Sequence, residues 1–320
     1  MRRLLLLLAL LAPSAAGAHE LFVSNERDNT VSVIDTKTLE VTRTFRVGRR
    51  PRGVLLSPDG SRLYVCASES DAVQVIDPAT GKLLHDLPAG RDPEQFALSP
   101  DGKRLWVANE DDAVSTVVDV ERRAVLGQVD VGVEPEGMAV SPDGRIAVVT
   151  AETSNMAHVI DTASLKVVAN IPVGERPRHA EFSADGTRLW VSSEIGGSVT
   201  VIDTAKREAI GSIRFEVRGV PADQIQPVGI RMTRDGTLAF VALGPANRVA
   251  IVDAKSLQVQ GYLLVGRRVW HLAMTPEEDL VFTTNGVSGD VSVIDVKARR
   301  VTKTIKVGRF PWGAAIRATP

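Results

Sequence analysis

Two adjacent positions in a repeated segment carry the side chains most suited to recognising a ligand. The first position follows a loop proline or its counterpart, and the second comes directly after it. The residues at the first position are Arg52, Glu94, Glu136, Arg178, Val228, Trp270 and Trp312. Those at the second are Gly53, Gln95, Gly137, His179, Gly229, His271 and Gly313. The charged, amide, imidazole and indole members of both sets are candidate contacts for a cofactor or small ligand, in a site that the glycines would leave open on some sides.

A second loop of the same repeats adds acidic side chains that could bind a metal ion. Its residues are Asn25, Glu26, Glu69, Asn109, Glu110, Glu152 and Glu194. Carboxylate oxygens suit a hard divalent cation, and imidazole nitrogens suit a transition metal. The candidate metal ligands are therefore Glu94, Glu136, Glu110, Glu152, Glu194, His179 and His271. The alternative is that these glutamates are solvated or pair with Arg52 and Arg178, and so join neighbouring repeats.

The remaining candidates indicate no catalytic residue. Trp270 and Trp312 could line a site for a ring-shaped ligand or a partner loop, or could simply pack between repeats. His85 and His158 fall inside strand patterns, and His19 lacks a neighbouring histidine with which to bind copper. The chain has no G-x-S-x-G motif and no glycine-rich phosphate loop. Binding is therefore favoured over catalysis, although the sequence leaves the choice open.

These positions belong to one unit that is written seven times. A segment with the consensus V-x-V-I-D begins at residues 31, 73, 115, 157, 199, 249 and 291. Successive copies are 42 residues apart, except for a spacing of 50 between the fifth and the sixth. A fixed period of this size is typical of repeat architectures.

Each unit reads as four short antiparallel strands. In one unit the apolar runs are 53–57, 62–68, 72–77 and 82–87, separated by turn residues such as Ser57-Pro58-Asp59-Gly60. Proline, aspartate and glycine at these places favour tight turns, and the Val, Ile and Leu content favours strands. Seven such units predict an all-β chain folded as a seven-bladed β-propeller with four antiparallel strands in each blade.

The two ends of the chain predict how the ring closes. The stretch "HELFVSN" aligns with the second strand of a unit, and the C-terminal "PWGAAIRA" aligns with the first. The C-terminal strand should therefore complete the blade that the N-terminal strands begin, leaving no free sheet edge at the seam.

The first 18 residues have the pattern of a secretory signal. Arg2 and Arg3 precede an apolar run, and small residues lead to an A-x-A site ending at Ala18. The run is shorter than the roughly 20 residues that span a bilayer. We therefore expect a signal peptide at 1–18, a single propeller domain at 19–320, export to the periplasm, and a mature chain without a membrane span.

The mature chain has little net charge and one cysteine. Removal of Arg2 and Arg3 changes the formal net charge from −1 to −3, which indicates no nucleic-acid partner. Cys66 lies in a strand pattern, so we expect a buried thiol and no disulfide. We also expect a monomer whose stability comes from core burial.

The repeats resemble those of the YVTN-repeat β-propellers over essentially the whole mature chain. The resemblance is carried by strands such as Phe22-Val23-Ser24-Asn25 and Trp106-Val107-Ala108-Asn109. More narrowly, the small seven-repeat layout and "HELFVSNE" resemble propellers associated with pyrroloquinoline quinone (PQQ)-dependent alcohol catabolism. That resemblance implies an accessory role beside a periplasmic quinoprotein dehydrogenase or an ABC-type transport component.

Two functions from different classes remain open. The first is a non-catalytic accessory propeller that binds a partner protein, a metal or a small ligand at its channel mouth. The second is a lactonase-type hydrolase that holds a divalent metal ion at the same mouth, with water as the nucleophile. The eight-residue excess falls within 214–227, on the expected mouth face between two blades, and is either part of that face or a neutral loop extension.

Overall fold

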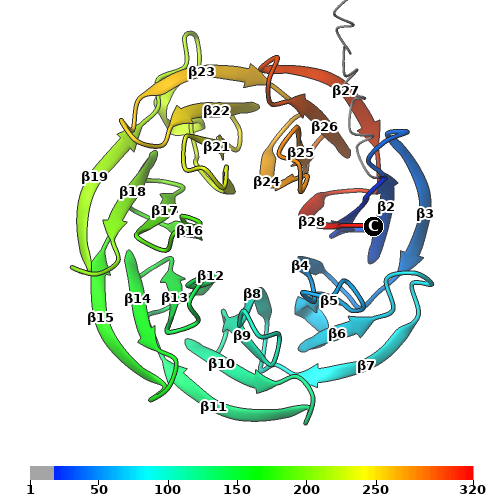
Figure 1. Ribbon diagram of the computed structural model, residues 1–320, viewed down its shortest axis with the longest axis vertical. Helices are drawn as coiled ribbons and strands as arrows, with labels where there is room; N and C mark the ends of the chain where they lie inside the picture. Colours follow the sequence, from blue (N-terminus) through cyan, green and yellow to red (C-terminus); the bar gives the residue numbers. More distant parts are fainter. Residues whose placement is uncertain (1–17, 320) are drawn as a thin grey trace, which may run out of the picture.

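The computed structural model describes residues 18–319 and shows a ring of seven four-stranded sheets, seen end-on in Figure 1. The inner strands are β4 (Pro51–Leu56), β8 (Pro93–Leu98), β12 (Pro135–Val140), β16 (Pro177–Phe182), β20 (Ile230–Met232), β24 (Val269–Met274) and β28 (Pro311–Arg317). The second strands are β1 (Glu20–Asn25), β5 (Leu63–Ala67), β9 (Arg104–Asn109), β13 (Ile146–Ala151), β17 (Arg188–Ser193), β21 (Leu238–Ala242) and β25 (Leu280–Asn285). The predicted seven-bladed propeller is confirmed.

The outer half of each blade holds the third and fourth strands. The third strands are β2 (Thr30–Asp35), β6 (Ala72–Ile76), β10 (Val114–Asp119), β14 (Met156–Asp161), β18 (Ser198–Asp203), β22 (Arg248–Asp253) and β26 (Asp290–Asp295). The fourth strands are β3 (Glu40–Arg46), β7 (Leu83–Pro88), β11 (Ala124–Asp130), β15 (Lys166–Pro172), β19 (Glu208–Arg214), β23 (Val259–Leu264) and β27 (Arg300–Lys306). Two short 3-10 helices, η1 (Ser68–Ser70) and η2 (Ala222–Gln224), lie in loops. No helix within residues 18–319 has the length and apolar character needed to cross a membrane.

The ring closes as the two ends of the chain predict. Strand β28 pairs antiparallel with β1, and this sheet has the order β28-β1-β2-β3. The blue and red ends of the chain therefore share one blade in Figure 1. The predicted signal peptide at 1–18 lies almost wholly outside the described residues.

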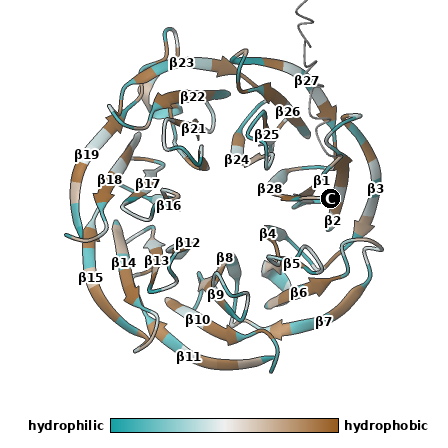
Figure 2. Cartoon of the chain, in the orientation of Figure 1, coloured by the Kyte–Doolittle hydropathy of each residue, from teal (hydrophilic) through white to brown (hydrophobic). Residues whose placement is uncertain are grey.

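The apolar core lies between neighbouring blades. Each blade-to-blade contact buries a cluster of side chains; one of them combines Tyr64 and Val73 from one blade with Phe96 and Val107 from the next. Figure 2 shows the apolar colouring along third strands such as β10, β22 and β26. Cys66 belongs to that cluster, and burial raises the pKa of its thiol well above the ordinary value, so the predicted buried thiol is confirmed.

The glycines of the inner strands allow close packing of adjacent blades. A Cβ on Gly137 would lie 2.7 Å from the carbonyl oxygen of Arg178, and one on Gly313 would lie 2.5 Å from that of Arg52. Real Cβ atoms do not approach a backbone oxygen so closely. These residues are glycines because the next inner strand passes against them, and not because the channel mouth is open there, as the sequence alone indicated.

Replacement of Gly137 by alanine should therefore lower the free energy of unfolding by about 1–3 kcal/mol, because the added methyl group overpacks a contact with backbone atoms. Gly261 is the matched control, since a Cβ there meets no atom within 4 Å. Gly261→Ala should change stability by less than about 0.5 kcal/mol. Denaturant unfolding of both variants tests this, and equal destabilisation would contradict it.

The turns between first and second strands share one hydrogen-bond pattern. In the turn at 57–60, Asp59 Oδ1 accepts from Ser57 Oγ at 2.5 Å and from the Ser61 N–H at 3.0 Å, and Gly60 has a φ of 68°. Asp143 accepts equivalent bonds from Ser141 and Arg145. Side-chain hydrogen bonds to the ionised carboxylates lower the pKa of both aspartates to about 2.

These low pKa values predict that the folded protein loses stability as the pH falls. A carboxylate with a pKa of about 2 in the folded protein and about 3.9 when unfolded stabilises the fold above pH 4, and that contribution is lost as the pH falls from about 4 to about 2. Thermal unfolding between pH 2 and 6 should show this loss. An Asp59→Asn, Asp143→Asn variant should have a shallower pH dependence in the same window, and an unchanged slope would refute the assignment.

Candidate functional site

Buried ion pairs fill the predicted channel mouth. Glu94 lies 3.0 Å from Arg50 Nη1 and 3.1 Å from Arg52 Nη1, and Glu136 Oε1 lies 3.1 Å from Arg178 Nη2. Glu94 and Glu136 are at most 1% exposed. The proposed pairing of these glutamates with Arg52 and Arg178 is therefore confirmed, and each pair joins two adjacent blades.

A wider network surrounds Arg178. Its guanidinium also contacts Glu152 and lies 3.7 Å from Glu194. Glu152 receives a further bond from Arg176 Nε at 2.7 Å, and Glu194 pairs with Arg268 Nη2 at 2.9 Å. The network therefore links loops of three blades across the mouth.

Burial controls the electrostatics of this network. It raises the pKa of Glu94 and of Glu136, although Arg52 and Arg178 oppose the shift. Burial also disfavours the charge of Arg178, but Glu136 and Glu152 outweigh it and raise the pKa of the guanidinium. Arg178 therefore stays protonated, and its charge stabilises the ionised form of the glutamates around it.

The structure brings three of the acidic residues of the mouth close together. Ligand oxygens of Asp92, Glu94 and Glu110 lie within 4.8 Å of one another, the one such group of three among residues 18–319. Arg50 Nη1 lies 3.0 Å from Asp92 and 3.0 Å from Glu94, where a bound cation would have to lie. A divalent metal ion at the mouth stays a prediction, and a cation there would compete with this guanidinium.

The two tryptophans of the mouth are covered by guanidinium groups. Arg268 lies 4.4 Å from the ring centroid of Trp270, and Arg52 lies 5.1 Å from that of Trp312. The ring of His271 lies 4.2 Å from that of Trp312, which is 1% exposed. These contacts favour packing as the role of Trp270, whereas Trp312 also borders the channel.

The longest loop ends in this network. Phe215 and Ile225 are buried between two blades, and Gln226 Oε1 accepts a hydrogen bond from Arg268 Nη1 at 3.2 Å. The excess of eight residues therefore helps to hold the mouth face together.

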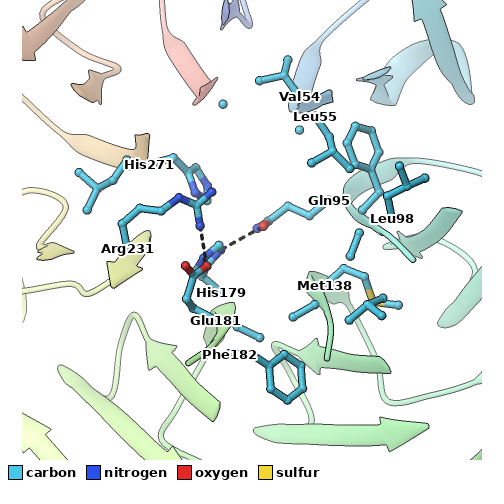
Figure 3. Close-up of a pocket in the computed structure, with 18 of the residues that line it drawn as sticks. Val54, Leu55, Gln95, Leu98, Met138, His179, Glu181, Phe182, Arg231 and His271 are labelled. Atoms are coloured by element: carbon cyan, nitrogen blue, oxygen red, sulfur yellow. Dashed lines mark hydrogen bonds and ion pairs between the residues drawn. The ribbon is translucent and has the colours of Figure 1, made fainter. Parts of the chain in front are cut away.

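A pocket of about 360 Å³ lies in the channel beneath the ion pairs. It extends along the inner strands from His179 and His271 to the turn residues Pro142 and Ala184, which lie on the face opposite the mouth. Figure 3 shows Gln95, His179, Glu181, Arg231 and His271 around it. The candidate residues thus fall into two layers: Gln95, His179 and His271 face this pocket, whereas Arg52, Glu94, Glu136 and Arg178 form the ion-paired layer above it.

Both ring nitrogens of His179 face side-chain oxygen atoms. Gln95 Nε2 donates to the Arg178 carbonyl at 3.0 Å, so Gln95 Oε1 faces His179 Nδ1 at 3.3 Å. On the other side of the ring, Nε2 lies 3.6 Å from Glu181 Oε2 and makes no hydrogen bond within 3.5 Å to any of the described residues.

Glu181 and Arg231 complete the polar side of the pocket and were missed in the sequence. Arg231 Nη1 lies 2.5 Å from Glu181 Oε2. Burial raises the pKa of Glu181, but Arg231 and His179 together lower it by more, so the pKa lies below its ordinary value. Strand periodicity could have found both residues, because side chains two positions after His179 and Gly229 face the same channel. At that position the other five repeats carry leucine or alanine.

Both pocket histidines are neutral bases. Burial lowers the pKa of His179, an effect that Glu181 partly offsets. Burial and the nearby positive charges hold the pKa of His271 well below its ordinary value. The rings lie 5.4 Å apart, and Nε2 of each lacks a partner among residues 18–319. Unpaired buried nitrogens beside a cavity indicate that a polar ligand or water binds there.

The remaining histidines lie away from this pocket. His158 Nε2 accepts from the Gly132 N–H at 3.0 Å and its Nδ1 contacts Asn170, as expected for a packed residue. His85 is partly exposed on β7. His19 Nε2 lies 2.9 Å from Glu277 at the closed seam of the ring.

Comparisons with known proteins agree with the fold. A YNCE-like beta-propeller model matches residues 5–117, and a model described as "Lactonase, 7-bladed beta-propeller" matches residues 160–309. No curated protein matches the chain. Among solved structures, the hydrazine synthase of Kuenenia stuttgartiensis is 24% identical with a TM-score of 0.79, covering 86% of this chain and 92% of that one. The periplasmic gluconolactonase of Pseudomonas aeruginosa is 20% identical with a TM-score of 0.79, covering 95% of this chain and all of that one.

Proposed function

We propose that this seven-bladed propeller hydrolyses a lactone in the channel pocket. The observation that carries the proposal is the grouping of His179, Glu181 and Arg231 in one cavity, where His179 Nε2 has no hydrogen-bond partner in the described part of the chain. All three residues lie within the segment that matches the lactonase model. The gluconolactonase with the same fold supports this reaction class only by analogy, since a propeller can serve many functions.

His179 is suited to act as the general base. Its Nδ1 faces Gln95 Oε1 at 3.3 Å, so the neutral ring can carry its proton on Nδ1 and present Nε2 to a water in the pocket. In the proposed reaction Nε2 takes a proton from water, and the hydroxide attacks the lactone carbonyl carbon. The imidazolium then returns the proton to the ring oxygen as the ring C–O bond breaks, so that water is added across that bond.

Arg231 and Glu181 are suited to stabilise the charges that develop. Arg231 uses Nη1 for Glu181, and its other N–H groups can donate to the oxyanion formed from the carbonyl oxygen. The Glu181 carboxylate, 3.6 Å from His179 Nε2, would stabilise the imidazolium. No step in this scheme requires the metal ion that the sequence suggested for the mouth.

The test is the turnover of lactones by the purified protein, followed in a pH-stat. We expect hydrolysis above the spontaneous rate, and we expect Glu181→Gln to reduce it without loss of the folded circular dichroism spectrum. A rate equal to the spontaneous one with every lactone tried would reject the function.

A second candidate is the accessory binding role that the sequence resemblance implies. It is favoured by apolar side chains exposed on loops around the mouth: Val133 and Ile195 are each 54% exposed, and Val287 is 45% exposed. In this proposal the exported protein binds a periplasmic quinoprotein dehydrogenase or an ABC-type transport component through that face. Co-purification of such a partner with the wild-type protein, and its loss in a Val133→Ser, Ile195→Ser variant, would support the role.

A further inference from the structure

The channel pocket has one polar wall and one apolar wall. Glu181 and Arg231 lie on β16 and β20, between His179 and His271. Across the pocket, the equivalent positions on β4, β8 and β12 are Leu55, Ala97 and Ala139. Gln95 also lies on β8, but its amide is engaged with the Arg178 carbonyl and with His179. Every second side chain of these strands faces the channel. The polar and apolar walls therefore differ at equivalent positions of the inner strands.

The apolar wall is completed by side chains that fill the gaps between those strands. They are Val54, Phe96, Leu98, Met138, Val140 and Phe182. None of them offers a hydrogen-bond donor or acceptor to a ligand hydroxyl group. A polyhydroxylated ring would therefore lose its water on this side without replacement bonds, which is unfavourable.

The charges of the pocket also disfavour a phosphorylated ligand. Among the described residues, Arg231 is the one lysine or arginine that lines the pocket, and its Nη1 is 2.5 Å from Glu181. The two lining histidines are neutral because burial lowers the pKa of each. The lining as a whole has no surplus positive charge for a phosphate group.

The pocket has room for a small ligand. Its volume of about 360 Å³ falls within the roughly 300–1,000 Å³ of small-molecule sites. It admits a single small ring with a short substituent. The apolar lining continues to Pro142 and Ala184 at the pocket edge.

We infer that the preferred substrate is a lactone with a short alkyl chain, and not a sugar lactone or its phosphate. This inference rests on the proposed function and specifies its substrate class. The ester group lies between His179 and Arg231, and the alkyl chain lies along Leu55, Ala97 and Ala139.

The test compares δ-nonalactone with glucono-δ-lactone, two neutral six-membered lactones of similar size. We expect kcat/KM to be about 100-fold higher for δ-nonalactone, because one methylene group in a hydrophobic pocket changes kcat/KM by roughly 10- to 200-fold. Ala97→Asn adds an amide to the apolar wall and should reduce this preference at least tenfold. Ala315→Asn is the matched control, since Ala315 has the same register on β28 but does not line the pocket.

Different failures separate the inference from the proposed function. Faster turnover of glucono-δ-lactone would overturn the inference and leave lactone hydrolysis standing. If neither of these lactones nor any other lactone tried is hydrolysed, the proposed function fails, and calorimetric binding decides the ligand class. Binding of δ-nonalactone that Ala97→Asn weakens and Ala315→Asn does not would support an alkyl-lactone pocket; no binding of δ-nonalactone would overturn it.

Discussion

Replacement of Arg178 by methionine should lower the free energy of unfolding by about 3–5 kcal/mol, the typical effect of removing one partner from a buried ion pair. Arg178 is 5% exposed and contacts both Glu136 and Glu152, which are also buried. Without the guanidinium these carboxylates must either stay charged in a dry environment or take up protons. Chemical unfolding at neutral pH measures the change.

Arg176 provides the matched control for this prediction. It contacts Glu152 at 2.7 Å, but its side chain is 45% exposed, so Arg176→Met should cost at most about 1 kcal/mol. Addition of Glu136→Gln and Glu152→Gln to Arg178→Met should restore part of the lost stability, because the uncompensated charges are removed. Equal effects of Arg176→Met and Arg178→Met would contradict the larger contribution assigned to the buried ion pairs.

Replacement of His179 by glutamine should reduce kcat for lactone hydrolysis by about 10²- to 10⁴-fold, the usual contribution of a general base. Glutamine keeps a polar side chain of similar reach beside Gln95 but cannot accept the proton from water. KM should change much less than kcat, because His179 acts on water and Arg231 remains to hold the carbonyl oxygen. Steady-state kinetics with δ-nonalactone measures both constants.

The pH profile gives a second test of the same role. The reaction needs neutral His179, and burial holds the pKa of this ring below its ordinary value of 6.5. Wild-type kcat/KM should therefore fall on the acid side only below pH 6.5, and this limb should vanish in the residual activity of His179→Gln. His85→Gln, which changes a partly exposed histidine on β7, should leave rate and profile unchanged. An unchanged rate in His179→Gln would exclude His179 as the base.

The fold could be predicted from local patterns repeated along the chain. The 42-residue period, the turn residues such as Pro58-Asp59-Gly60, and the first-strand pattern at the C-terminus each indicate a short-range feature of one blade. All blades follow the same pattern, and the two ends of the chain both supply strands to one blade. Seven such blades therefore predict a closed ring. The structure has this ring, with β28 paired to β1.

The site was predicted only in part, because its contacts join blades that lie far apart in the sequence. The sequence alone determined at which positions the side chains of the seven repeats differ. It also offered, as one alternative, that the glutamates pair with Arg52 and Arg178. It could not show that Gln95 reaches His179, 84 residues away, or that Arg231 reaches Glu181, 50 residues away.

The closed ring decided these contacts. It places equivalent positions of all seven repeats around one narrow axis, where size and charge select which side chains touch. The same crowding explains Gly137 and Gly313, whose small size admits a neighbouring strand. Periodicity and turn residues thus determined the blade, whereas the ion-paired mouth and the two-sided pocket beneath it exist only once seven blades converge.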